Sequence, residues 1–175
     1  MDSYNPNPLN SKNFKILSFN IIHQTQNPIV NIPNSLVEKE SINENLSNIT
    51  RTLTFSPMAM GMNQLNGDFT INNASFDMDV INYEIPLNNI EIWELRNQSA
   101  ISHPFHIHDI QFNILSRNGQ TPLPNEQGLK DVVLVRPGET VRFITKFETF
   151  SNPHVPYMFH CHLLPHEDGG MMGQF

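Results

Sequence analysis

The sequence is short of cysteine, of basic charge and of long hydrophobic runs, and each shortage excludes a class of protein. Its one cysteine, Cys161, cannot form a disulfide within the chain, so it is a buried thiol, a reactive thiol or a metal ligand. The formal net charge of −7 argues against nucleic acid as a partner. No apolar stretch is long enough to cross a membrane. The 175 residues are sufficient for one acidic globular domain.

Most apolar residues follow the two-residue alternation of β-strands. In "RTLTFS", Leu53 and Phe55 share one face with Arg51, and the hydroxyl residues share the other. Similar runs occur at 90–95, 110–116, 131–135, 140–147 and 156–161, and turn sequences such as "RPGE" separate them. No long helical period competes with these runs. We therefore expect an all-β fold, an antiparallel β-sandwich or barrel with Greek-key connections.

The first fifty residues have a different character. One strand-like stretch at 14–22, "FKILSFNII", precedes a segment with asparagine and proline that has little apolar period. A lone strand cannot bury both of its faces by itself. We therefore interpret residues 1–50 as the end of a preceding domain plus a linker, and residues 51–175 as a separate β domain.

Six of the eight histidines fall into two tight groups, "HPFHIH" at 103–108 and "HCHLLPH" at 160–166. Residues two apart on a strand share a face, so His106 and His108 project together, as do His160 and His162, while Cys161 points the opposite way. An isolated pair of this kind is commonly a surface or packing feature, but two pairs around the only cysteine favour metal binding. One strand can then serve two metal centres, one on each face.

The cysteine side of this arrangement can be completed by His103 and His166, with a methionine of "GGMM" as a weak axial ligand. Two histidines, one cysteine and a long axial methionine are the ligand set of blue-copper electron-transfer sites. Zinc is the competing metal, because it also accepts cysteine and histidine in tetrahedral sites. Zinc gives no reason, however, for the pairs of histidines on the opposite face.

These motifs resemble the two C-terminal copper motifs of multicopper oxidases, the family of laccases and bacterial cuprous oxidases. The resemblance also covers "FTINNASFDMD", "EIWELRN", "QFNILSRNGQTPLPNEQGLKDVVLVRPGETVRF" and "VPYMFHCH", and so extends over about residues 51–175, which resemble the last cupredoxin domain of that family. It implies a cupredoxin fold in which His103, Cys161 and His166 bind a type 1 copper. Met171 is implied as the axial ligand, with Met172 as the less favoured choice.

The resemblance further implies a trinuclear copper site on the opposite face of the strand. His106 would bind the type 2 copper, and His108, His160 and His162 would bind the type 3 pair. Electrons from a reducing substrate would pass through the cysteine to its flanking histidines, next to the site where oxygen is reduced to water. Glu167 occupies the position of an acid that assists proton delivery in laccase-like members. The alternative interpretation of Glu167 is a solvated surface carboxylate.

Other polar and sulfur-bearing residues carry weaker indications. Asp168 and Asp109 are weaker acid candidates, and we expect His23 and His154 to be ordinary polar residues outside the metal sites. A methionine-rich stretch, "SPMAMGM", could hold Cu(I) through soft thioethers, but we expect its methionines to pack. These residues are Met58, Met60 and Met62.

A complete trinuclear site in this family uses four His-x-His pairs, and this chain supplies two. Three interpretations follow. In the first, the chain is the C-terminal part of a multicopper oxidase whose N-terminal domains lie on another chain or in a missing segment. In the second, it is a self-sufficient blue-copper electron-transfer protein. In the third, two copies of the chain pool their histidine pairs. We favour the first, because the linker and the strand at 14–22 need a preceding domain. An isolated monomer is then not expected to act as an oxidase.

The resemblance also implies the partners of such a domain. They are a small reducing substrate, namely a phenol, an aromatic amine or a metal ion such as Cu(I), and oxygen as the acceptor. It implies a periplasmic or extracellular location, although "MDSYNPNPLNSKNFK" lacks the basic start and apolar stretch of a secretory signal. An export signal could lie upstream of Met1. Neither a membrane nor nucleic acid is expected as a partner.

Overall fold

The structure is a computed structural model, and it describes residues 17–23, 25–34, 38, 41–57, 69–152 and 154–175. The chain divides into two units, Met1–Lys39 and Glu40–Phe175. The described residues of the first unit contain no helix or strand, so the strand expected at 14–22 is not observed in residues 17–22, and residues 14–16 lie outside the described ranges. An extended segment becomes a strand only when a neighbour completes its backbone hydrogen bonds. The preceding domain therefore stays a prediction.

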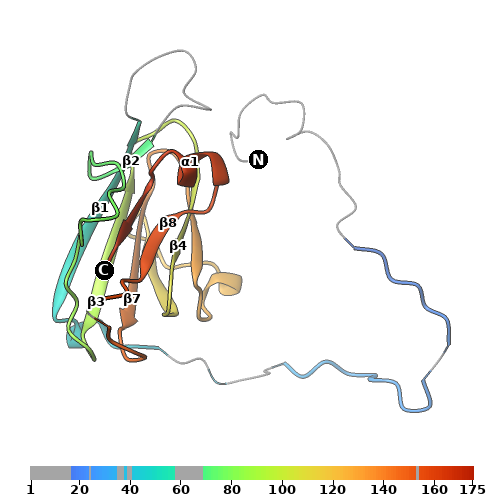
Figure 1. Ribbon diagram of the computed structural model, residues 1–175. Helices are drawn as coiled ribbons and strands as arrows, with labels where there is room; N and C mark the ends of the chain where they lie inside the picture. Colours follow the sequence, from blue (N-terminus) through green and yellow to red (C-terminus); the bar gives the residue numbers. More distant parts are fainter. Residues whose placement is uncertain (1–16, 24, 35–37, 39–40, 58–68, 153) are drawn as a thin grey trace. The chain divides into compact units, whose positions relative to one another are not determined.

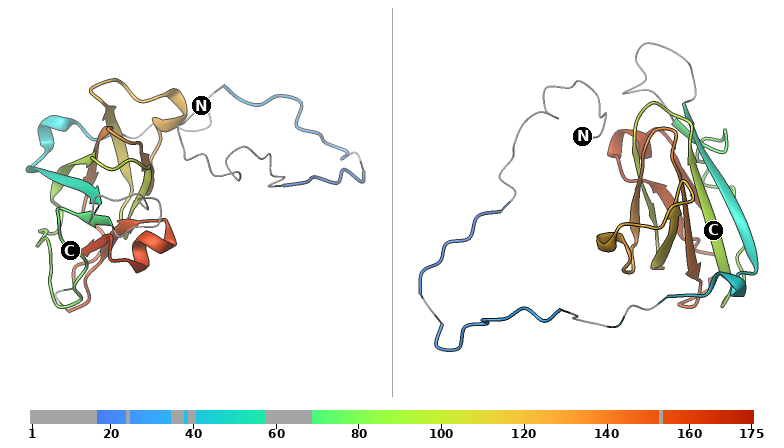
Figure 2. Two further views of the ribbon diagram at one scale, coloured as in Figure 1. Left: turned by 90° about the horizontal axis from the view of Figure 1, so that it is seen from above. Right: turned by 180° about the vertical axis from the view of Figure 1, so that it is seen from behind.

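The second unit contains two β-sheets, shown in Figure 1. The larger sheet has five strands, in the order β2 (Phe69–Ile71), β1 (Ile49–Pro57), β3 (Ile90–Asn97), β7 (Thr140–Lys146) and β5 (Phe112–Arg117). The smaller sheet has four, in the order β6 (Val132–Val135), β4 (His103–Ile107), β8 (Met158–Cys161) and β9 (Met172–Gln174). The helices of the described residues are short, namely the 3₁₀ helices η2 (Glu44–Leu46) and η3 (Pro124–Glu126) and the α-helix α1 (Leu164–Asp168). Figure 2 shows the two sheets from above and from behind, with α1 beyond one end of β8.

The sequence prediction of an all-β sandwich is confirmed. Each of the six runs with strand alternation overlaps a strand of the structure, namely β1, β3, β5, β6, β7 and β8. One pair departs from the expected antiparallel arrangement, because β1 and β3 run parallel, from Ile49 beside Glu91 to Phe55 beside Asn97. A parallel pair needs a long crossover connection, and the segment between β1 and β3 provides it. The alternation does not predict β2, β9 or α1, because elements of three to five residues are too short to show a period.

Aromatic side chains fill the space between the sheets. Trp93 of β3 is fully buried, and its ring lies 6.3, 6.0 and 5.4 Å, between centroids, from those of Phe105, Phe143 and Phe159. These rings come from β4, β7 and β8, so one aromatic cluster joins both sheets. Burial of a phenylalanine side chain stabilises a fold by about 1.5–3 kcal/mol. The cluster therefore fixes β4 and β8, which carry the histidine motifs, against the larger sheet.

A buried ion pair adjoins this core. Glu91 is fully buried, and its carboxylate accepts two hydrogen bonds from Arg51, at 2.6 and 2.9 Å, and one from the indole nitrogen of Trp93, at 3.0 Å. A carboxylate without such partners would be costly in this environment. Arg51 thus points inward with Leu53 and Phe55, as the alternation predicts.

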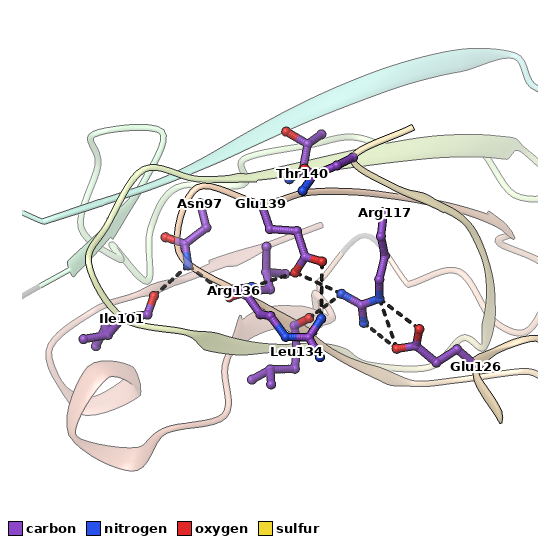
Figure 3. A network of polar contacts seen from close by, with 10 residues as sticks. Asn97, Ile101, Arg117, Glu126, Leu134, Arg136, Glu139 and Thr140 are labelled. Atoms are coloured by element: carbon purple, nitrogen blue, oxygen red, sulfur yellow. Dashed lines mark hydrogen bonds and ion pairs between the residues drawn. The ribbon is translucent and has the colours of Figure 1, made fainter. Parts of the chain in front are cut away.

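A second polar network ties β3, β5 and β7 together, as Figure 3 shows. Arg117 of β5 donates hydrogen bonds to Glu126 of η3, at 2.7–3.0 Å, and to Glu139 in the turn before β7, at 3.0 Å. The backbone of this turn also holds the end of β3, because the N–H of Asn97 donates to the Glu139 carbonyl and the Asn97 carbonyl accepts from Gly138, both at 2.9 Å.

Within the described ranges, no helix is long and apolar enough to span a membrane.

Candidate metal centres

The two histidine motifs lie on neighbouring antiparallel strands, β4 and β8. In their register, Phe105 is opposite Cys161, and His106 is opposite His160. Residues opposite each other in a ladder share a face of the sheet. The inner face, toward the larger sheet, therefore carries the cysteine and the core phenylalanines, and the outer face carries the histidines that flank the cysteine. The expected separation of Cys161 from its neighbours is observed.

The inner group consists of His103 at the start of β4, Cys161 at the end of β8 and His166 in α1, all buried. The Nδ1 atoms of His103 and His166 lie 3.5 and 3.6 Å from Sγ of Cys161. The three candidate ligand atoms lie within 4.8 Å of one another, close enough to hold one metal ion. The ring of Phe69 packs against both imidazoles, at centroid distances of 4.8 and 4.5 Å, and shields them from solvent.

His166 reaches the inner group because the chain turns into α1 directly after β8. Leu163 is the extended residue before the helix, and its carbonyl accepts hydrogen bonds from the amides of His166, at 2.8 Å, and Glu167, at 3.0 Å. A proline in the first turn favours this start, since it lacks the N–H that the first helical residues leave unpaired. A continued strand would instead carry residue 166 away from Cys161.

The register of β8 and β9 separates the two candidate methionines. Met172 is opposite His160 and so shares the outer face. Met171 is fully buried in the same core cluster as Cys161, whose amide donates to the Met171 carbonyl at 3.0 Å. Met171 is therefore the methionine on the cysteine side of the sheet. Its role as an axial ligand stays a prediction.

Burial favours the neutral forms of His103 and Cys161. It lowers the pKa of His103 from 6.5 to about 3, and the neighbouring His166 acts in the same direction. It also raises the pKa of the Cys161 thiol from 9.0 to about 12. A bound cation would reverse both effects, because it stabilises the thiolate and competes with protons for the imidazole nitrogens.

The outer group consists of His106, His108 and His160, whose ligand atoms also lie within 4.8 Å of one another. The Nε2 atoms of His108 and His160 are 3.2 Å apart. The ring of His162 stands beside them, with centroid distances of 5.6 Å to His106 and 5.5 Å to His160. Nδ1 of His106 lies 2.8 Å from the carbonyl of Asp131, which can only accept, so a neutral ring keeps the lone pair of its Nε2.

The outer group is open to further ligands. His160 is buried, His106 and His108 are half-buried, and His162 is exposed. Burial, and then the neighbouring His160 imidazole, lowers the pKa of His108. Neutral imidazoles on an accessible sheet face can bind metal from the side that this domain does not cover.

Glu167 is a residue of α1 that lies beside the outer group. Its Oε2 atom is 3.4 Å from Nδ1 of His160, and the side chain is 27% exposed. The same imidazole nitrogen lies 3.2 Å from the carbonyl of Cys161. The carboxylate thus lies beside a histidine ring and is also partly exposed to solvent. Its role in proton delivery stays a prediction.

The remaining sequence candidates belong to neither group in the described part of the chain. The side chains of Asp109, Asp168, His23 and His154 are exposed, and none belongs to a metal-type group among the residues that the structure describes. Met58, Met60 and Met62 of the methionine-rich stretch lie outside the described residues.

Several contacts at the two groups have no signature in the sequence. Oγ of Ser99 lies 2.7 Å from Nε2 of His103, Phe69 covers the inner imidazoles, and a backbone carbonyl holds His106. A serine four residues before a histidine is common in loops and belongs to no metal motif. Only the path of the chain between β3 and β4 brings Ser99 to the ring.

Comparison with known proteins identifies relatives of this chain. The chain matches the sequence model of multicopper oxidases over residues 43–175. It is 37% identical over 147 residues to the multicopper oxidase mco of Staphylococcus haemolyticus, covering 82% of this chain and 30% of that protein. It is 40% identical over 130 residues to bilirubin oxidase of Albifimbria verrucaria, covering 70% and 22%. The solved structure of the laccase-like multi-copper oxidase CueO of Ochrobactrum sp. superposes with a TM-score of 0.76 at 35% identity, covering 86% and 35%.

The chain thus spans about a third or less of the length of these relatives. The matched region contains both β-sheets and both histidine groups. On the strength of this match, the chain belongs to the multicopper oxidase family.

Proposed function

We propose that this chain is the electron-receiving domain of a multicopper oxidase. Electrons from a reducing substrate enter at the inner group, on the inner face of the smaller sheet. They pass to the outer group on the opposite face, where oxygen is reduced to water. The placement of Cys161 between His160 and His162 carries this proposal. Each face of β8 contributes to a separate group of metal-type ligands, so two candidate ligand groups meet at adjacent residues of the chain.

The inner group fits a type 1 copper. His103 and His166 would provide imidazole nitrogens, Cys161 a thiolate and Met171 an axial thioether, which together are the blue-copper ligand set. Bound copper would supply one-electron chemistry here and oxygen chemistry at the outer group. Zinc would also fit two imidazoles and a thiolate, but it has no redox chemistry to connect with the histidines on the outer face.

The polypeptide itself connects the two groups. A few covalent bonds of the main chain separate Sγ of Cys161 from the rings of His160 and His162. A hydrogen-bond contact adds a shorter route, because Nδ1 of His160 lies 3.2 Å from the Cys161 carbonyl. The burial of Cys161 excludes water from the inner group, and the aromatic core holds β8 rigid, so electrons can cross the strand without a large rearrangement.

The outer group is half of an oxygen-reducing site. It offers the imidazoles of one half of the ligand set implied by the family resemblance, and its outer side is accessible. The remaining domains of the oxidase would supply the other half of this ligand set. They would also form the route by which the reducing substrate approaches. The relatives, of which this chain spans about a third or less, have the length to contain such domains.

Glu167 would carry the protons that water formation consumes. Its Oε2 atom lies 3.4 Å from Nδ1 of His160 while the side chain keeps contact with solvent. The carboxylate can therefore take a proton from water and hold it beside the outer group.

Copper loading of the metal-free chain tests the inner group. The wild type is expected to develop the intense visible absorption of a copper–thiolate bond and to retain copper in preference to zinc. Cys161→Ser should abolish the absorption, whereas the matched variant His106→Ala, on the outer face, should keep it. A colourless copper-loaded wild type, or preferential retention of zinc after equal exposure, would refute the type 1 assignment.

Oxygen consumption tests the outer group. The monomer alone should not reduce oxygen to water, and a polypeptide with the first two domains of a multicopper oxidase should restore the uptake. His106→Ala should then remove the uptake and leave the colour. Water-forming uptake by a preparation that light scattering shows to be monomeric would contradict the half-site proposal, and uptake only by a dimer or trimer would favour pooled histidine pairs.

A further inference from the structure

We infer that Asn97 and Ser99 are positioning residues that set the tautomer of His103 and present its Nδ1 lone pair to the inner group. Neither residue belongs to a metal motif. Ser99 contacts Nε2 of the His103 ring, whereas Cys161 faces the other ring nitrogen, Nδ1. The inference deepens the proposed function, and it rests on that function for the identity of the metal. The geometry that carries it is independent of any metal.

The side-chain amide of Asn97 has one orientation that suits its neighbours. Its Nδ2 donates to the carbonyls of Ile101, at 2.7 Å, and Val135, at 3.0 Å, and a carbonyl can only accept. Its Oδ1 accepts from the amide N–H of Ser99, at 2.9 Å, and an amide N–H can only donate. A flipped amide would place donor against donor and acceptor against acceptor. Oδ1 therefore faces Ser99.

The backbone of Asn97 is held as firmly as its side chain. Its N–H donates to the Glu139 carbonyl and its own carbonyl accepts from Gly138, both at 2.9 Å. The carboxylate of Glu139 is bound in turn by Arg117, at 3.0 Å, and Figure 3 shows Asn97 beside this network. Asn97 is 2% exposed, so water does not compete for these bonds.

The hydroxyl of Ser99 has one proton and, besides the N–H of Ile101 that donates to it at 3.4 Å, three polar neighbours. Its Oγ lies 2.8 Å from Oδ1 of Asn97, 3.0 Å from the carbonyl of Ile101 and 2.7 Å from Nε2 of His103. The first two neighbours can only accept, so the hydroxyl proton is donated to one of them. If it went to Nε2 instead, both of these acceptor oxygens would face a lone pair of Oγ in a buried site, whereas donation to one of them leaves only the other in that position. Oγ of Ser99 therefore accepts a hydrogen bond from Nε2–H of His103.

This direction decides the tautomer of the ring. A neutral imidazole carries one N–H, so a proton on Nε2 leaves a lone pair on Nδ1. Nδ1 is the atom that lies 3.5 Å from Sγ of Cys161. In the other tautomer, an N–H would point toward the cysteine and block a metal ligand position. A hydrogen bond at the far nitrogen is the usual way in which a protein orients a metal-binding histidine.

The first test needs no metal. Nitrogen-15 NMR of the metal-free wild type at neutral pH should show His103 with its proton on Nε2. A proton on Nδ1 would overturn the inference. Ser99→Ala should remove the preference and populate the Nδ1–H form, whereas Ser99→Thr, which keeps the hydroxyl, should retain the wild-type tautomer.

The second test measures metal binding. Ser99→Ala should weaken Zn²⁺, used as a redox-silent probe in competition with a chelator, by about 10–100-fold. It should also raise the reduction potential of the copper-loaded protein, because an imidazole without its hydrogen-bond acceptor is a poorer electron donor. The matched control is Ser102→Ala, which removes another buried hydroxyl, next to His103 in the chain.

The outcomes separate this inference from the proposed function. An unchanged tautomer and Zn²⁺ affinity in Ser99→Ala, or the same changes in Ser102→Ala, would overturn the positioning role. A colourless copper-loaded wild type would refute the proposed function, while the tautomer of the metal-free protein would still decide the role of Ser99.

Discussion

Acidification should destabilise the metal-free domain through His103. The pKa of this histidine is 6.5 as an unperturbed group and about 3 in the folded protein. Between these two values the unfolded chain binds a proton that the folded chain does not, so stability rises with pH and is lost as the pH falls. The loss begins near pH 6.5 and ends near pH 3, and above this window the group contributes nothing.

The expected magnitude follows from the width of this window. One pKa unit corresponds to about 1.4 kcal/mol, so at about pH 5 the free energy of unfolding should fall by about 2 kcal/mol. The structure explains the size of the shift, because the ring is fully buried between Phe55 and Phe69, at centroid distances of 5.8 and 4.8 Å. A charged imidazolium there would exchange water for aromatic rings.

Urea denaturation of the metal-free chain, with a chelator present, measures this effect at about pH 7, 6 and 5. His103→Gln is the informative variant, because its amide N–H can still donate to Ser99 but nothing titrates. Between the two extremes of pH, the wild type should lose about 2 kcal/mol more than this variant. His162→Gln, at an exposed histidine, should keep the wild-type dependence. Equal pH dependence in the wild type and His103→Gln would refute the reasoning.

Three further predictions concern the axial ligand, the buried ion pair and the packing of β9. Met171→Leu should keep the copper–thiolate colour and raise the reduction potential, whereas Met172→Leu should change neither. Loss of copper from Met171→Leu, or a shifted potential in Met172→Leu alone, would show that Met171 is not the axial ligand. Glu91→Gln should lower the free energy of unfolding in urea by about 3–5 kcal/mol, since it leaves a largely buried guanidinium uncompensated, and a loss below about 1 kcal/mol would contradict this. Gly173→Ala should cost about 1–3 kcal/mol, because its Cβ would overlap the ring of Phe159, so an unchanged melting temperature would argue against this tight packing.

The sequence alone predicts most of the fold because strand periodicity is local. The runs at 51–56, 90–95 and 140–147 each show the alternation, and each forms a strand. The parallel pairing of β1 with β3 is not predictable in this way, since either direction of the neighbour leaves the same residues on the inner face. Periodicity also predicts a strand at 14–22, but it cannot show whether a partner strand is present to pair with it.

The sequence by itself determined which residues of β8 face in opposite directions. Alternation along an extended chain is a consequence of backbone stereochemistry, so "HCH" places Cys161 opposite its two neighbours before any tertiary contact forms. The tertiary structure alone decided which distant groups meet these residues. It brings Cys161 to His103, 58 residues away, separates Met171 from Met172 by the register of β9, and sets Ser99 behind the imidazole. These contacts depend on strand order and on packing between two sheets, which residues far apart in the chain specify together.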